Sequence, residues 1–285
     1  TTIPLGQDNV IIDANSALGA SNTISLDTRY LWHDCNFTGV PNAATLTVDI
    51  FSNPTMTGDL TFASGMTFAD SVASTFRIAF GTETNTLTMN GVAFGTNINV
   101  ETGGTSGTLI LADAVTMSDT ARNWVHRGGT LDLATNNIVF TAGLFNSSVS
   151  TTRTINMGTA TMILNGTGTV WTTNTTTGLT MNPSTSTIKF TNTSATQRLF
   201  AGGGATFNNF WHAGGAGGAT LEVRGNNTFN DFKDDGSVAR TILFGRNQTQ
   251  TVTTFTVSGT SGNVVTINSS DGAGSASTDT HTLKS

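Results

Sequence analysis

Short blocks in which polar and apolar residues alternate recur along this chain at almost constant spacing. The blocks Thr-Leu-Thr-Met at 86–89, Thr-Leu-Ile-Leu at 108–111 and Thr-Leu-Asp-Leu at 130–133 follow one another at equal intervals. The block Thr-Ile-Asn-Met at 154–157 comes after a slightly longer interval. Alternation with a period of two is typical of strands that have one buried and one solvent-facing side. One such strand in every twenty or so residues indicates a solenoid, in which each coil buries its apolar side against its neighbours.

The apolar marker of these blocks extends in both directions in steps of roughly 20–24 residues, a period typical of solenoids. It gives thirteen positions: Ile3, Ile24, Leu46, Met66, Leu87, Leu109, Leu131, Ile155, Leu179, Leu199, Leu221, Ile242 and Val264. A second apolar pair follows at a similar offset in many coils: Val92/Phe94, Val115/Met117, Ile138/Phe140, Met162/Leu164, Ile188/Phe190, Phe207/Phe210 and Phe229/Phe232. Two strand markers in one phase predict about thirteen stacked coils.

The turns and the coil length specify the fold class. Asn90-Gly91, Asn165-Gly166 and the glycines at 202–204 supply turns, and no stretch of 11 residues shows the apolar stripe of a helix. A coil of about 22 residues accommodates three short strands, whereas hexapeptide β-helices need about 18. Parallel crossovers are strongly right-handed. We therefore predict an all-β chain that folds as a right-handed parallel β-helix, with residues 1–285 as a single domain.

Composition excludes several partners. Only 11% of residues are charged and the formal net charge is −6, so no basic stripe for nucleic acid is expected. No apolar run approaches 18 residues, so membrane insertion is not expected either. The single cysteine, Cys35, rules out an internal disulfide framework. We predict a small core residue there; an intermolecular bridge or a reactive thiol is the alternative.

The last third of the chain has the style of a known group of proteins. Residues 219–232 read Ala-Thr-Leu-Glu-Val-Arg-Gly-Asn-Asn-Thr-Phe-Asn-Asp-Phe, and 251–270 continue the same Thr-, Asn- and Gly-rich alternation. This text resembles the repetitive β-helix segments of bacterial secreted surface proteins and of phage tail or fibre proteins. The resemblance implies a structural or adhesive rod outside the cell and transfers no catalytic motif. Because the strand pattern runs close to both ends, we expect the solenoid to meet more chain or another subunit there.

Catalytic and metal chemistry have few candidates. Glycoside hydrolysis needs two carboxylates about 5–10 Å apart. Asp231, Asp234 and Asp235 form the densest acidic cluster, which we interpret as a solvated turn, and Asp113 and Asp132 lie at different phases of adjacent coils. The four histidines are scattered, so no metal site built on histidine, no other cofactor and no catalytic residue are predicted. Calcium ligation by Asp, Asn and loop carbonyls stays open.

Three of the four tryptophans stand beside a histidine. These pairs are Trp32 with His33, Trp124 with His126, and Trp211 with His212. An aromatic ring with a polar neighbour can stack on a sugar, so the six residues are candidate glycan ligands. Their phases differ, which favours separate corner or subunit contacts over one shared groove.

Three functions are compatible with these observations. The first is a non-enzymatic structural solenoid, a stiff rod in an extracellular assembly such as a phage tail, virion appendage or cell-surface fibre, which associates with itself as a trimer or fibre or with other structural subunits. The alternative is an adhesin or receptor-binding module that recognises surface glycans through loops such as 211–218. A polysaccharide depolymerase of the tailspike type ranks last, because no convincing carboxylate pair aligns across neighbouring coils.

Overall fold

A computed structural model describes residues 7–13, 16, 22–26, 31–40, 44–48, 53–70, 73–213, 219–235, 238–270 and 282–284. The regular structure of these residues consists of short β-strands. The strands are β1 (Val10–Ile11), β2 (Thr23–Leu26), β3 (Leu31–Trp32), β4 (Cys35–Asn36), β5 (Thr45–Val48), β6 (Thr55–Met56), β7 (Leu60–Thr61), β8 (Thr67–Asp70), β9 (Ser74–Gly81), β10 (Thr84–Thr88), β11 (Ala93–Phe94), β12 (Ile98–Gly104), β13 (Thr108–Leu111), β14 (Val115–Met117), β15 (Asn123–His126), β16 (Gly129–Asp132), β17 (Val139–Ala142), β18 (Leu144–Asn146), β19 (Arg153–Asn156), β20 (Thr161–Leu164), β21 (Gly168–Thr172), β22 (Leu179–Asn182), β23 (Thr187–Phe190), β24 (Arg198–Ala201), β25 (Thr206–His212), β26 (Thr220–Arg224), β27 (Thr228–Asp234), β28 (Arg240–Phe244), β29 (Thr249–Val257), β30 (Val265–Ser269) and β31 (Thr282–Lys284).

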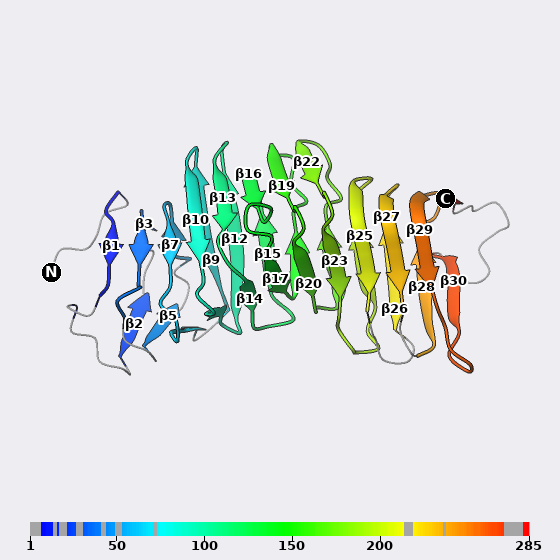
Figure 1. Ribbon diagram of the computed structural model, residues 1–285, viewed down its shortest axis with the longest axis horizontal. Helices are drawn as coiled ribbons and strands as arrows, with labels where there is room; N and C mark the ends of the chain where they lie inside the picture. Colours follow the sequence, from blue (N-terminus) through cyan, green and yellow to red (C-terminus); the bar gives the residue numbers. More distant parts are fainter. Residues whose placement is uncertain are drawn as a thin grey trace.

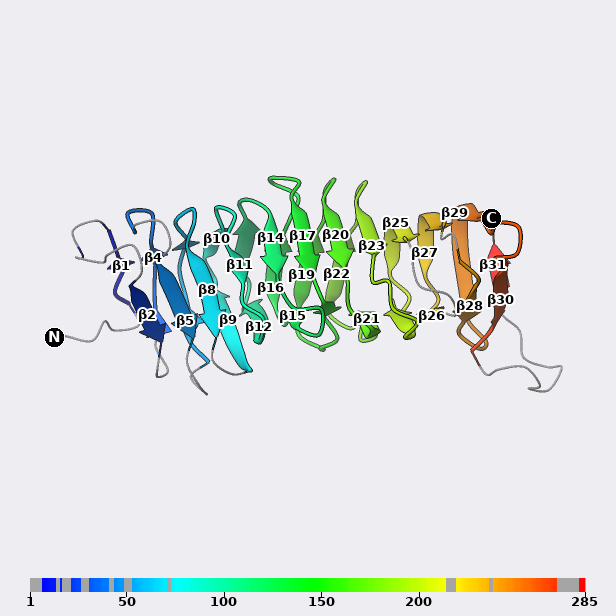
Figure 2. The same ribbon diagram turned by 90° about the horizontal axis from the view of Figure 1, so that it is seen from below.

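Consecutive strands belong to different sheets, so the chain winds as a coil. The sheets run in the orders β1-β4-β7-β10-β13-β16-β19-β22, β11-β14-β17-β20-β23-β25-β27-β29-β31, β3-β6-β9-β12-β15-β18-β21-β24-β26-β28-β30 and β2-β5-β8. We call them the eight-, nine-, eleven- and three-stranded sheets. Neighbouring strands within them pair in parallel. The strands lie across the long axis and stack along it, with β1 and β30 near opposite ends (Figures 1 and 2).

These features confirm the predicted all-β parallel solenoid. Register partners in the eleven-stranded sheet are one turn apart in the sequence; the turn is short between Val125 and Asn146 and longest between Gly168 and Arg198. The described residues make about ten turns, and the count of thirteen coils for the whole chain stays a prediction. The right-handed winding stays a prediction.

The first marker does not follow one side of the solenoid. Its positions lie in the three-stranded sheet up to Phe68, in the eight-stranded sheet from Leu87 to Met181, and in the eleven-stranded sheet from Leu199 onward. Ile3 lies outside the described residues. The second marker is the consistent one, because all seven of its pairs lie at or within strands of the nine-stranded sheet.

The cross-section changes along the rod. Turns from β3 to β23 contain three strands each, as the coil length predicted. The eight-stranded sheet ends at β22, and from β24 onward each described turn has only two strands. The strands β25, β27 and β29 are correspondingly longer, with 7, 7 and 9 residues. Figure 1 shows these longer strands between β23 and the C-terminal end of the described rod.

Aromatic side chains fill the core in a continuous column. Ring contacts with centroid separations of 4.6–6.4 Å connect Phe37, Phe62, Phe94, Trp124, Phe140, Phe145, Trp171, Phe200, Phe229, Phe232 and Phe255 in that order. We call this series the aromatic column. Aromatic pairs at such separations contribute about 0.5–1.5 kcal/mol beyond the burial of their surface. The column therefore couples the packing of one turn to the packing of the next.

One corner of the coil repeatedly uses a left-handed backbone. The residues with positive φ at the exit from the eight-stranded sheet are Gly65 (80°), Asn90 (48°), Gly91 (82°), Asn137 (49°), Gly158 (55°) and Ser184 (48°). Glycine adopts this conformation without steric cost, and asparagine tolerates it better than other residues. The Asn-Gly step at 90–91 that predicted a turn is part of this corner.

Candidate binding groove

The outer face of β9, β12 and β15 carries the most distinctive polar arrangement on the rod. Alternation turns Phe76, Ile78 and Phe80 of β9 inward and leaves Arg77 and Ala79 outside. The register places Arg77 beside Glu101 and Ala79 beside Gly103. The outer face therefore carries two rows of residues. Arg77 and Glu101 belong to a charged row, and Ala79 and Gly103 belong to a row with almost no side-chain volume.

Two arginines hold the Glu101 carboxylate. Arg77 Nε lies 3.4 Å from Glu101 Oε1, and Arg127 Nε lies 2.7 Å from Glu101 Oε2. The side chains of Arg77 and Arg127 are 41% and 51% exposed, whereas that of Glu101 is 21% exposed. Because each arginine faces Glu101 with Nε, its terminal amino groups remain as further donors on a side chain that is about half exposed. The trio has a net charge of +1.

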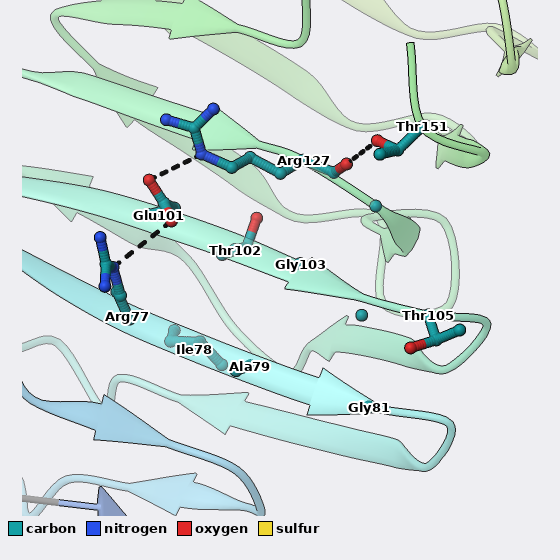
Figure 3. A pocket seen from close by; sticks show the side chains of 12 residues that line it. Arg77, Ile78, Ala79, Gly81, Glu101, Thr102, Gly103, Thr105, Arg127 and Thr151 are labelled. Carbon is teal, nitrogen blue, oxygen red and sulfur yellow. Dashed lines mark hydrogen bonds and ion pairs between the residues drawn. The ribbon is translucent and has the colours of Figure 1, made fainter. Parts of the chain in front are cut away.

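A groove of about 410 Å³ lies beside this trio and follows the row of small residues. Its lining consists of Arg77, Ile78, Ala79, Gly81, Glu101, Thr102, Gly103, Gly104, Thr105, Arg127, Gly128 and Thr151. Figure 3 shows Glu101 between the two arginines and Thr151 hydrogen-bonded to the main-chain carbonyl of Arg127. The glycines hollow out the surface, and the arginines supply charge at its rim.

The glycines of the groove differ in what they tolerate. A Cβ on Gly103 would approach the Arg127 Cβ to 3.4 Å, an ordinary contact, so a side chain there would project into the groove. A Cβ on Gly104 would come within 2.5 Å of the Phe80 ring, which is buried in the core. Gly103 is therefore the position at which the groove can be filled without disturbing the fold.

The structure does not bring the predicted tryptophan–histidine pairs together. Trp32 lies on β3, Trp124 on β15 and Trp211 on β25, so the three pairs occupy separate places on the solenoid, as their different phases favoured. Trp32 and Trp124 are core residues, with 6% and 0% exposure. Alternation along these strands places both rings on the inward face, where the neighbouring positions are also buried.

The histidine at the end of β15, His126, is buried as well. His126 is 0% exposed and its Nδ1 lies 3.2 Å from Thr102 Oγ1. Burial lowers the pKa of His126 to about 4, more than offsetting the main-chain hydrogen bonds at Gly129 and Thr154 that raise it. Such a neutral, enclosed imidazole is a structural group rather than a ligand for a glycan.

Trp211 is partly exposed, but two lysine side chains contact its ring. Lys189 on β23 and Lys233 on β27 flank it in register, with their Nζ atoms 3.6 Å and 4.4 Å from the ring centroid. The indole Nε1–H donates to Asp235 Oδ1 at 2.7 Å. Burial alone would raise the pKa of Asp235, but the bonds from Trp211 and Lys233 lower it. Two cation–π contacts thus occupy the ring surface that a stacked sugar would use. The remainder of the candidate loop, 214–218, lies outside the described residues.

His33 borders an open hollow. Its Nε2 lies 3.3 Å from Glu83 Oε2, and its Nδ1 lies 3.2 Å from Asp34 Oδ1. The hollow measures about 260 Å³ and shares Ala79 and Gly81 with the larger groove. His33 therefore lies near the groove formed by Arg77, Glu101 and Arg127, which the sequence analysis did not identify.

The acidic cluster is only partly the solvated turn that we expected. Asp234 is 0% exposed: its Oδ2 accepts from His212 Nδ1 at 2.7 Å, and its Oδ1 lies 2.7 Å from Arg240 Nε. Burial lowers the pKa of His212 despite this hydrogen bond, and His212 is likewise enclosed. Asp231 and Asp234 are three residues apart on β27, on opposite faces of the strand. They do not form a carboxylate pair.

Other aspartates satisfy main-chain amides. Asp113 accepts from the N–H groups of Met89 and Asn90 at 2.7 and 2.6 Å, and Asp132 accepts from Thr135 at 2.8 Å. Asp34 and Asp59 each accept from an amide on the following coil, Asp59 and Thr86 respectively. These carboxylates hold neighbouring coils and corners together, which is a structural use of the charge.

The fold and the groove define the class of this protein: a parallel β-solenoid with a shallow, cationic, glycine-lined groove on one side. Comparisons with protein-family models, with curated proteins and with solved structures found no match. Within the described ranges, no three His, Cys, Asp or Glu side chains are grouped so that they could hold a metal ion. The part of the chain that the structure describes also has no helix of the length and apolarity needed to span a bilayer.

Proposed function

We propose that this protein is a non-enzymatic structural β-solenoid, a stiff rod in an extracellular assembly such as a phage tail, a virion appendage or a cell-surface fibre. The aromatic column carries this proposal, because it runs from Phe37 to Phe255 without a break. Protein cores pack as densely as organic crystals, so bending the rod would open gaps between rings of adjacent turns. Parallel backbone ladders along all sides oppose the same deformation.

The use of charge supports a structural role. Only 11% of residues are charged; Asp113 and Asp132 bond to main-chain amides, and Asp234 pairs with the buried Arg240. Threonine and asparagine keep the outer face wetted without charge, which suits a surface exposed outside the cell. The proposed rod thus depends on hydrogen-bonded carboxylates rather than on reactive ones.

Exposed apolar side chains support association. Among the described residues, the large hydrophobic side chains with high exposure are Ile11, Leu31, Val139, Val264 and Ile267, at 43–69%. Four of them lie on or next to the outermost strands β1, β3 and β30, and Val139 lies on β17 in the middle of the rod. Unpaired strand edges with apolar neighbours favour stacking on another subunit. We propose self-association, as trimers or fibres, or contact with other structural subunits.

Negative-stain electron microscopy combined with light scattering tests the structural proposal. We expect rods that assemble with concentration. Ile267→Asp, 43% exposed in the wild type, should shorten end-to-end assemblies. Val139→Asp, at a site 47% exposed in mid-rod, is the matched control that leaves end contacts intact and reports lateral ones. A wild-type protein that stays monomeric at all concentrations, alone and with its native assembly, would contradict the proposal.

The groove supports a second function, an adhesin that binds an acidic surface glycan. Arg77 and Arg127 are about half exposed and line the same groove as Ala79 and Gly103. A carboxylated sugar would pair its carboxylate with a guanidinium and lay its ring on the small residues. Binding of uronic- and sialic-acid oligosaccharides to immobilised protein tests this function. Gly103→Leu should abolish binding, and binding that survives this variant would place the glycan elsewhere.

A further inference from the structure

The eight-stranded sheet ends part-way along the rod, at β22. The nine- and eleven-stranded sheets continue past this strand to β31 and β30 (Figure 1). β22 pairs with β19 along one edge, and no described strand pairs with its other edge. The rod therefore carries a ledge on one side, where the edge of a strand is free.

The register identifies the main-chain groups at this free edge. The Asn182 carbonyl accepts a hydrogen bond from the N–H group of Met157, at the end of β19, at 3.0 Å, so Asn182 faces β19. Alternate residues of a strand direct their main-chain groups to opposite edges, so Met181 and Leu179 face the free edge. The Leu179 N–H donates to the Thr176 carbonyl at 2.9 Å. The carbonyl of Leu179 and both main-chain groups of Met181 are left to pair with a further strand.

The ledge also leaves the end of a core row partly open. Met181 follows Leu109, Leu131 and Ile155 in a row of register partners, and these three side chains are 0% exposed. Met181 and its neighbour on the same face, Leu179, pack against the core but are only partly buried. A further strand with an apolar side chain in this row would remove the rest of their apolar surface from water, which is favourable.

A hollow of about 220 Å³ lies beside these two side chains. Its lining consists of Thr176, Leu179, Met181, Gly204, Ala205 and Thr206. The last three lie at the corner between β24 and β25, where earlier turns of the coil insert a strand of the eight-stranded sheet. Because residues 202–205 are three glycines and an alanine, this corner leaves room for a side chain from a strand on the ledge.

The width of the ledge specifies what can occupy it. Both other sheets continue past β22, so the end of a second rod cannot stack there, whereas one extended segment can. The described strands of this chain already belong to its own sheets, so the segment comes from a different polypeptide. The free main-chain groups select a peptide over a sugar or a lipid, because they repeat at the spacing of a strand.

We infer that an extended segment of another polypeptide, apolar at alternate positions, adds as a strand to the free edge of β22. Its main chain pairs with Leu179 and Met181, and one of its apolar side chains enters the hollow. The inference goes beyond the proposed rod function, because it depends neither on self-association nor on the acidic-glycan groove.

Fluorescence anisotropy with the full chain tests the inference. The probe is a labelled peptide that copies residues 128–135, Gly-Gly-Thr-Leu-Asp-Leu-Ala-Thr, which include a strand of the same sheet. We expect saturable binding, and replacing both leucines of the peptide by serine should weaken it at least about tenfold. Adjacent residues face opposite edges, so N-methylation of the peptide at Leu131 or at Asp132 blocks the ladder in only one of the two cases. One methylated peptide should therefore bind at least about tenfold more weakly than the other.

A pair of protein variants places the peptide. Thr206→Arg, at an exposed position that lines the hollow, should weaken binding of the leucine peptide at least about tenfold. Thr251→Arg, at an exposed position two turns further along the same row, is the matched control and should retain binding.

The peptide series on the wild type decides the question even where Thr206→Arg fails to fold. The absence of saturable binding up to about 1 mM would overturn the inference. Equal affinities of the leucine and serine peptides, or of the two methylated peptides, would overturn it as well. Binding that a folded Thr206→Arg variant leaves unchanged would place the peptide elsewhere and would also overturn it.

Discussion

Phe145 and Trp171 lie on successive turns with their ring centroids 4.6 Å apart and their planes inclined by 19°. This is the closest contact of the aromatic column, and both side chains are fully buried. The Trp171 Nε1–H also donates to Thr173 Oγ1 at 3.1 Å, so the ring is anchored at its polar edge. The pair is where the column is most sensitive to a loss of volume.

Trp171→Ala should lower the free energy of unfolding by about 3–5 kcal/mol, because it leaves a large cavity next to Phe145 and Phe200. Trp171→Phe keeps a ring in the column and should cost much less, chiefly the hydrogen bond to Thr173, at about 1 kcal/mol. Urea unfolding followed by circular dichroism measures both. Equal losses for the two variants would show that the column does not stabilise the rod.

Stability should fall as the pH drops from about 6.5 to 4, because burial lowers the pKa of His126 to about 4. The unfolded chain binds a proton on His126 near pH 6.5, whereas the folded chain does so only near pH 4. The free energy of unfolding is therefore undiminished above pH 6.5 and decreases below it, by about 3 kcal/mol in total for this residue.

Urea midpoints measured across this pH range check the prediction. His126→Gln should flatten the dependence by the share that His126 contributes. The remaining slope should report His212, whose pKa is lowered in the same direction. A pH dependence that is identical in His126→Gln and the wild type would mean that His126 does not control it.

Asn90→Ala should destabilise the protein through both the backbone and a lost hydrogen bond. Asn90 has φ of 48°, and its Nδ2 donates to the Phe62 carbonyl at 2.8 Å. Alanine adopts the left-handed conformation at a cost of about 1–2 kcal/mol, and the Asn90→Ala variant also loses the hydrogen bond to Phe62. Asn90→Gly loses only the hydrogen bond, so it should be the milder change. Differential scanning calorimetry distinguishes them; a glycine variant no more stable than the alanine variant would refute the backbone explanation.

Cys35 should be inert in the folded protein. Its side chain is 1% exposed, and burial, aided by the charge of Asp34, raises the pKa of the thiol to about 12. A disulfide-exchange reagent such as DTNB should titrate no thiol in buffer and one thiol in guanidinium chloride. Thr38→Cys in a Cys35→Ala background places a thiol at an exposed position of the same coil and should react at once. Rapid labelling of native wild type would contradict this prediction.

The sequence predicts the strands well because alternation is local. Phe207 and Phe210 of β25, and Phe229 and Phe232 of β27, are buried as the second marker required.

Register is less accessible from the sequence. The blocks at 86–89 and 108–111 look equivalent, yet Leu87 faces Leu111 across the sheet rather than Leu109. The length of the corner shifts the pairing by two positions. Because a shift of two preserves the buried face, the alternation gives no sign of it.

The site is harder to predict for a related reason. Arg77 and Glu101 are register partners on the outer face. Their spacing of one coil in the sequence was therefore the only hint that the two charges lie side by side. That signal is meaningful only once the register is known. The tryptophan–histidine pairs were conspicuous in the sequence, but Trp124 and His126 lie on the inward positions of β15, and their burial removes them from any surface site.

The parallel winding also has a consequence for folding kinetics. Strand partners in the eleven-stranded sheet are separated by a single turn of the coil, wherever they lie in the chain. The entropy of closing each turn is therefore nearly the same, and adding a turn to a folded stack does not require contacts between distant parts of the chain. A nucleus of a few stacked turns can grow by zipping in either direction. A longer rod of this design would take more steps to complete, but its slowest step would not become slower.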